Sequence, residues 1–271
     1  SLPELRRRPR APADAARQAT RRLPRQHAAG FEDFRLGTPC AIARAMSKTE
    51  DYVRPRTRLY LITPPRIEDV EGFAALLETA LSAGDVACLQ LRLKADTGEI
   101  DVDATRAVGA AVTEMAQAYG VAVLVNDSAE LAVEIGADGV HVGMDDMPVK
   151  KAREIVGPDM IVGATAKNSR HAAMQACEAG ADYVAFGAFF PTRTKTGTVE
   201  ANPDLLEIWQ ESMEVPCVAI GGITVENAEP LAVAGADFLA VSSGVWDHPE
   251  GAPVAIAHFN ALLDRLDASK A

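Results

Sequence analysis

The sequence predicts an α/β protein, a closed (β/α)8 barrel, and three observations support this prediction. After residue 56, short apolar runs alternate with helical patterns, eight of each. The runs are nearly continuous in Val, Ile, Leu and Ala, which is typical of parallel strands covered on both faces. A Gly-Ala-Asp joint follows three of the helical patterns, at residues 136–138, 180–182 and 235–237. A doubly wound open sheet is the alternative architecture.

Each element follows from its local pattern. With 48% hydrophobic but only 5% aromatic residues, small aliphatic side chains must build the core. The expected strands are 58–63, 86–92, 121–125, 138–142, 160–164, 182–187, 216–221 and 237–242. The expected helices are 68–83, 102–119, 128–135, 149–156, 168–179, 203–213, 225–234 and 252–267. The glycine of the repeated joint suits the left-handed position that ends a helix, so we interpret the joint as a packing device.

Charge divides the chain into two parts. The net charge is −11 over 271 residues, yet residues 1–45 contain ten Arg, no Lys and four acids. We therefore expect residues 1–45 to be a basic, disordered extension and residues 46–271 to form a single barrel domain. A targeting or nucleic-acid-binding arm is the alternative role for the extension.

The same composition disfavours several classes of protein. The acidic charge of residues 46–271 disfavours nucleic-acid binding. No apolar run reaches the roughly 18 residues that a membrane span needs, and we expect no signal peptide because residues 1–45 contain no apolar h-region. The four cysteines form no CxxC pair, which argues against zinc ribbons and redox dithiols. We expect a cytoplasmic protein without a nucleic-acid or membrane partner, and a homo-oligomer stays open.

Polar side chains alternate with leucines at the end of the second expected strand. Gln90, Arg92 and Lys94 share one side of the strand, and Leu91 and Leu93 share the other. The planar guanidinium group of Arg can donate two hydrogen bonds to one phosphate, whereas the ammonium group of Lys acts as a point charge. Two solvated surface cations are the alternative, but an amide within an apolar strand favours a binding site.

Acids follow the next two strands. Asn126 and Asp127 follow the third strand, and Asp146 follows the fourth. Magnesium takes one or two carboxylates together with waters and substrate phosphates. The alternative is that Asp127 caps the helix that begins near residue 128 and that Asp146 is an ordinary turn residue. The cationic strand end beside Asp127 favours a Mg²⁺ site.

The loops after the last three strands combine hydroxyl groups, a lysine and glycines. Backbone N–H groups of glycines and helix N-termini suit phosphate, and phosphate sites after strands 7 and 8 are common in such barrels. Ordinary turn glycines are the alternative. Two anion sites at one barrel mouth would indicate two phosphorylated small-molecule substrates, with the cationic site suited to a pyrophosphate leaving group. The candidate residues are Thr192, Thr194, Lys195, Gly222, Ser242 and Ser243.

At these residues the sequence resembles the thiamine phosphate synthase family, over about residues 57–266. The resemblance implies a transferase of thiamine biosynthesis on a (β/α)8 barrel. It would join hydroxymethylpyrimidine pyrophosphate to hydroxyethylthiazole phosphate, giving thiamine phosphate and pyrophosphate. Pyrophosphate leaves before the thiazole nitrogen attacks, so no protein nucleophile is needed. The matching stretches are 90–94, 126–127, 139–146, 191–195, 221–223 and Ser243.

The resemblance also implies a role for each candidate. Asp127 and Asp146 would bind Mg²⁺. The catalytic cations and pyrophosphate ligands would be Arg92, Lys94 and Lys195, with Thr165 at the position of the family's serine. Gln90 and Asn126 would hold the pyrimidine. The thiazole phosphate would lie on Thr192, Thr194, Gly222, Ser242 and Ser243.

Some positions depart from the family pattern. Met144 stands where the family usually has Gln, and Ala188 where it usually has Pro, which puts substrate affinity or identity in doubt. One alternative is therefore a noncatalytic phosphate-ligand-binding relative. Another is a thiazole tautomerase-like isomerase on the same barrel, but its working histidine would fall at Lys167.

Overall fold

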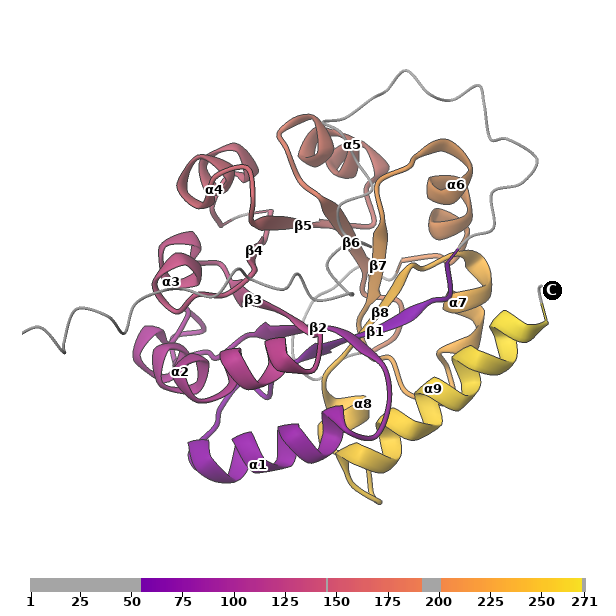
Figure 1. The fold of residues 1–271 in the computed structure, drawn as a ribbon. Helices are drawn as coiled ribbons and strands as arrows, with labels where there is room; N and C mark the ends of the chain where they lie inside the picture. Colours follow the sequence, from indigo (N-terminus) through magenta and orange to yellow (C-terminus); the bar gives the residue numbers. More distant parts are fainter. Residues whose placement is uncertain (1–54, 145, 192–200, 270–271) are drawn as a thin grey trace, which may run out of the picture.

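The structure is a computed structural model that describes residues 55–144, 146–191 and 201–269. Within these residues, eight parallel strands close into a barrel in sequence order, and β8 pairs with β1. Helices surround the strands (Figure 1). The predicted (β/α)8 barrel is confirmed and the open sheet is excluded. The expected basic extension, residues 1–45, lies outside the described residues.

The strand predictions are confirmed to within one residue, except that β5 continues three residues further, to Lys167. The strands are β1 Arg58–Ile62, β2 Val86–Leu91, β3 Ala122–Asn126, β4 Gly139–Val142, β5 Ile161–Lys167, β6 Tyr183–Gly187, β7 Cys217–Ile220 and β8 Phe238–Val241.

Two helix predictions need correction. Helix α7 begins at Glu229 rather than 225, because Asn227 folds the preceding residues into a turn: its Oδ1 accepts from the N–H of Thr224 and its Nδ2 donates to the carbonyl of Gly222. The sequence reading also missed α8. The helices are α1 Val70–Leu81, α2 Val102–Ala118, α3 Ala129–Glu134, α4 Val149–Val156, α5 Arg170–Glu178, α6 Asp204–Ser212, α7 Glu229–Ala234, α8 Ser243–Trp246 and α9 Ala252–Ala268.

The alternation of side chains along each strand separates two hydrophobic clusters. Tyr60 and Ile62 of β1 point into the barrel, whereas Leu59 and Leu61 pack in the layer between the strands and the helices. Leu91 also lies in this outer layer, as its spacing predicts. The inner cluster has fewer members than the outer one, and four of them are alanines: Ala87, Ala122, Ala185 and Ala240.

The repeated Gly-Ala-Asp joint acts as a packing device, as expected. The Oδ2 atom of Asp138 accepts the N–H of Val123 at 2.8 Å, and the N–H of Asp138 donates to the carbonyl of the same residue at 2.7 Å. The same reciprocal pair links Asp182 with Val162, and Asp237 with Cys217. Each joint therefore anchors a loop to the start of the preceding strand, at the amino-terminal end of the barrel.

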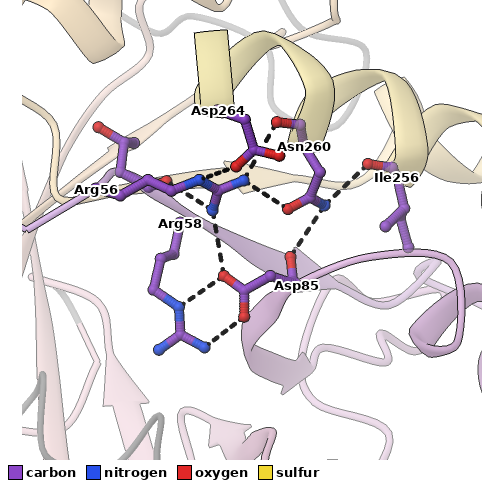
Figure 2. A network of polar contacts seen from close by, with 7 residues as sticks. Arg56, Arg58, Asp85, Ile256, Asn260 and Asp264 are labelled. Atoms are coloured by element: carbon purple, nitrogen blue, oxygen red, sulfur yellow. Dashed lines mark hydrogen bonds and ion pairs between the residues drawn. The ribbon is translucent and has the colours of Figure 1, made fainter. Parts of the chain in front are cut away.

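A polar network at the same end joins the first strands to the last helix (Figure 2). Arg58 holds the carboxylate of Asp85 through two hydrogen bonds, of 2.8 and 2.7 Å. Arg56 reaches Asn260 Oδ1 at 2.8 Å and Asp264 Oδ1 at 2.7 Å. Asn260 in turn donates to the carbonyl of Asp85 at 3.2 Å. The network fixes α9 against β1 and the start of β2, and leaves the opposite end of the barrel for ligands. Among the described helices, none is long and apolar enough to cross a membrane.

Candidate active site

The end of β2 places an amide and two cations at the barrel mouth. Gln90 is the last inward-facing residue of β2 and is only 3% exposed. Arg92 follows the strand, and its backbone N–H donates to Oγ1 of Thr63 at 2.9 Å. Lys94 is anchored by a backbone hydrogen bond to Pro65, and its Nζ lies 2.9 Å from Oδ2 of Asp127. The loops after β1 and β2 therefore hold both cations beside the end of β3.

Asp127 has a geometry that excludes the helix-cap alternative. Its backbone is left-handed (φ 62°), and the side chain that caps α3 belongs to Ser128, which accepts from the N–H of Leu131. Its Oδ2 instead accepts from Nδ2 of Asn126 as well as from Lys94. The carboxylate thus turns toward the cations of β2 and away from the helix that follows it.

A continuous chain of hydrogen bonds runs from Asp127 through the inside of the barrel. Asn126 Oδ1 accepts from Gln90 Nε2 at 2.6 Å, and Gln90 Oε1 accepts from the hydroxyl of Tyr60 at 3.1 Å. The Tyr60 hydroxyl also lies 2.9 Å from that of Tyr183. Burial above all raises the pKa of both phenols well above 10.0, so both stay neutral.

The chain continues across the barrel to β5. Tyr183 contacts Nδ1 of His141 at 2.8 Å, and Nε2 of His141 contacts Oγ1 of Thr165 at 2.9 Å. Because Tyr60 uses its proton on Gln90, Tyr183 must donate to Tyr60 and accept from His141. Nδ1 of His141 then carries a proton. From His141 onward, every donor in the chain points toward Asp127.

Arg92 lies in the field of both predicted metal ligands. Burial lowers the pKa of Arg92, and the charges of Asp127 and Asp146 oppose that shift. Asp146 belongs to the loop after β4, and its Oδ2 lies 2.1 Å from the place that a Cβ at Gly143 would take, so a side chain there would displace the carboxylate. The sequence predicted that these two acids would face the cations after β2, and the structure places both acids within electrostatic reach of Arg92.

The loops after β6, β7 and β8 pack against one another. A Cβ at Gly222, which has a φ of 64°, would meet the carbonyl oxygen of Pro191 at 2.4 Å, and a Cβ at Gly244 would meet that of Ile223 at 2.2 Å. These contacts bring Gly222 and Ser243 into one rim, and Ser242 Oγ donates to the carbonyl of Thr63 at 3.4 Å. Thr192, Thr194 and Lys195 lie outside the described residues.

Tyr60, Tyr183 and His141 were not predicted as site residues from the sequence. The signal was available in the alternation, since Tyr60 and Tyr183 share the inward phase of β1 and β6. A second signal was Gly163, where a Cβ would lie 2.0 Å from the Tyr183 ring, so the tyrosine needs a glycine on the neighbouring strand.

Polar and charged side chains that meet at the carboxyl end of a closed barrel define the class, a (β/α)8-barrel enzyme. The family model described as thiamine monophosphate synthase matches residues 59–245. The chain belongs to this family.

Relatives and solved structures agree with that assignment. The thiamine-phosphate synthase of Hyphomonas neptunium is 68% identical over 213 residues, which cover 79% of this chain and 96% of the relative. That of Rhodospirillum centenum is 56% identical, with 76% and 97% covered. The structure of thiamine phosphate pyrophosphorylase from Pyrococcus furiosus is 30% identical, with a TM-score of 0.65 and coverage of 77% and 96%. A 3-hexulose-6-phosphate synthase, 18% identical with a TM-score of 0.54, shares the fold alone; 75% of this chain and 99% of that one are covered.

Proposed function

We propose that this protein is a thiamine-phosphate synthase. It joins hydroxymethylpyrimidine pyrophosphate to hydroxyethylthiazole phosphate and releases thiamine phosphate and pyrophosphate. The observation that carries the proposal is the arrangement of Lys94 and Asp127 beside the buried Gln90–Asn126 amide pair. This arrangement offers a cation and an acid for a metal-bound pyrophosphate next to amides that suit a pyrimidine.

The residues at the mouth fit a magnesium ion. Asp127 and Asp146 offer carboxylate oxygens, the ligands that Mg²⁺ prefers, and both act on the same guanidinium group, that of Arg92. We assign Asp127 and Asp146 as the metal ligands. When bound, Mg²⁺ would neutralise part of the charge that develops on the departing pyrophosphate.

The remaining roles follow from position and chemistry. Arg92 and Lys94 stabilise the negative charge that grows on the leaving group, and Lys195 adds a third cation from the loop after β6. Gln90 and Asn126 orient the pyrimidine, because Tyr60 fixes the first amide from behind. Thr165 contacts the pyrophosphate from β5. The thiazole phosphate binds on Thr192, Thr194, Gly222, Ser242 and Ser243.

The hydrogen-bond chain supports a reaction without a protein nucleophile. Both ring nitrogens of His141 already contact a neighbour, Nδ1 the hydroxyl of Tyr183 and Nε2 that of Thr165, so we assign His141 a positioning role and no role as a base. Pyrophosphate leaves first, and the thiazole nitrogen then captures the pyrimidine-stabilised cation. The residues of the mouth bind, orient and neutralise charge.

The tautomerase alternative is not favoured. Lys167 stands at the position of that enzyme's histidine, and it is exposed with a left-handed backbone (φ 52°) at the end of β5. We place the enzyme in the cytoplasm, which accords with the burial of Cys88, Cys177 and Cys217 in the core.

The test is an incubation of the purified protein with both substrates, with and without Mg²⁺. Thiamine phosphate and pyrophosphate should form in equal amounts, and only with the metal. Binding of both substrates without product would instead indicate a noncatalytic relative. Conversion of a thiazole carboxylate phosphate isomer without use of the pyrimidine would indicate a tautomerase.

A further inference from the structure

Two histidines and a glutamate form a cluster near the last helix that the synthase chemistry does not use. His248 and Glu250 lie in the loop between α8 and α9, and His258 lies on α9. One ligand atom from each residue lies within 4.8 Å of the others, and the two imidazole ring centres are 5.9 Å apart. Glu250 and His258 are exposed and His248 is half-buried, so an ion could enter from solvent.

We propose that His248, Glu250 and His258 form a second metal site, which binds a transition-metal ion such as Zn²⁺. Imidazole nitrogen and carboxylate oxygen are the ligands that Zn²⁺ takes in proteins. Magnesium prefers oxygen ligands throughout, as at Asp127 and Asp146. The two sites should therefore select different ions by the chemistry of their ligands.

A neighbouring acid adds to the negative potential at this cluster. Glu226 lies in the loop before α7, and hydrogen bonds with Thr224 and with its own backbone lower its pKa. The charges of His248 and His258 contribute to the same shift, so Glu226 lies within electrostatic reach of both rings. A dication between the histidines would experience the field of two carboxylates, those of Glu250 and Glu226.

Metal binding would compete with one hydrogen bond of the loop. Nδ1 of His248 accepts the backbone N–H of Glu250 at 3.2 Å. A metal on Nδ1 would replace that bond, and a metal on Nε2 would put the proton on Nδ1 and break it. In both cases the turn at residues 248–250 loses this hydrogen bond, and the metal ion links the turn to His258 of α9. This turn follows α8, so the ion would fix α8 and the rim residue Ser243 at its start.

The experiment is a calorimetric Zn²⁺ titration of the untagged full chain after treatment with a chelator, in excess Mg²⁺ so that oxygen-only sites are filled. His258→Gln and Glu250→Gln each remove one ligand. Each should weaken Zn²⁺ binding about tenfold or more, because even residues outside the ligand set change metal affinity by that factor. His171→Gln is the matched control, since His171 is an exposed histidine on α5, outside the cluster.

Co²⁺ gives a second readout through its visible absorption, which should appear in the wild type and in His171→Gln and be lost in His258→Gln. Circular dichroism would show that each variant is folded. The proposal is overturned if the wild type does not bind Zn²⁺, if His258→Gln binds as well as the wild type, or if Mg²⁺ displaces the ion. Synthase activity without Zn²⁺ should be unchanged in Glu250→Gln, so this test stands apart from that of the proposed function.

Discussion

The Nζ atom of Lys94 lies 2.9 Å from Oδ2 of Asp127, which also accepts from the amide of Asn126. Both charged side chains are largely withdrawn from solvent, at 18% and 15% exposed. An ion pair with this degree of burial is screened less than one at the surface. The pair therefore orients the carboxylate before any ligand binds.

Asp127→Asn should raise the Mg²⁺ concentration needed for half-maximal activity by roughly 10- to 100-fold, because it removes one anionic ligand. The measurement is the initial rate of pyrophosphate release against Mg²⁺ concentration. Ser128→Ala is the control, since Ser128 is the residue that caps α3. It should cost about 1 kcal/mol of stability and leave the metal dependence unchanged. Full activity of Asp127→Asn at limiting Mg²⁺ would exclude Asp127 as a ligand.

If Lys195 has the proposed role, Lys195→Ala should lower kcat together with kcat/KM, because a cation that neutralises charge on the leaving group stabilises the transition state more than the bound substrate. Loss of one such preorganised contact costs about 3 kcal/mol, or roughly a hundredfold in rate. Steady-state kinetics with both substrates measure the effect. A change confined to KM would show that Lys195 only binds substrate.

Tyr183→Phe should destabilise the protein by about 1–3 kcal/mol, because it leaves Tyr60 and His141 without their shared buried partner. Urea unfolding followed by circular dichroism measures the change. Tyr119→Phe is the control: within residues 55–144, 146–191 and 201–269 its hydroxyl meets only Ser82, in an exposed contact, so stability should change by less than about 0.5 kcal/mol. Equal effects of the two substitutions would contradict a continuous chain inside the barrel.

Asp85→Asn should remove a contribution to stability that depends on pH. Burial of Asp85 opposes its ionisation, but the hydrogen bonds and charge of Arg58 and the charge of Arg56 outweigh this and lower the pKa below its usual 3.8. A lowered folded-state pKa means that the contribution is complete above the unfolded value and is lost as pH falls through the folded value.

The difference in unfolding free energy between wild type and Asp85→Asn should therefore be largest near neutral pH and should shrink below about pH 4. Denaturant unfolding at a series of pH values measures it. Asp103→Asn is the control, because its ion pair with Arg106 lies at the surface and should contribute little at any pH. A difference for Asp85→Asn that is constant with pH would contradict the assignment.

Much of the fold could be predicted because its determinants are local. The alternation of Gln90 with Leu91 sets which side chain enters the barrel, and Leu91 does lie in the outer layer. The Gly-Ala-Asp joints bond to the start of the strand that precedes them, so their signal also lies in short stretches of chain. The site candidates at strand ends follow from the fold itself, since parallel strands end at one mouth.

The parts that could not be predicted depend on contacts distant in sequence. Helix α8 has only four residues and no side-chain cap bond. It is held because Trp246 donates to the carbonyl of Ile62 at 2.7 Å and packs against Phe73. Tyr183 likewise depends on Tyr60, which lies 123 residues earlier. The alternation along each strand places both tyrosines inside the barrel, but no local pattern shows that their hydroxyl groups meet.

The pairing of β1 with β8 has a consequence for synthesis on the ribosome. Thr57 Oγ1 donates to the carbonyl of Ala236, 179 residues later in the chain. The barrel therefore cannot close until the last strand has been synthesised. At a translation rate of about 5–20 residues per second, that interval is on the order of 10–40 s. Throughout it, one edge of β1 stays unpaired, and Arg56 lacks Asn260 and Asp264. A nascent chain therefore cannot cover this edge of β1 until β8 has been made, and closure of the ring removes an open strand edge of the kind that promotes aggregation.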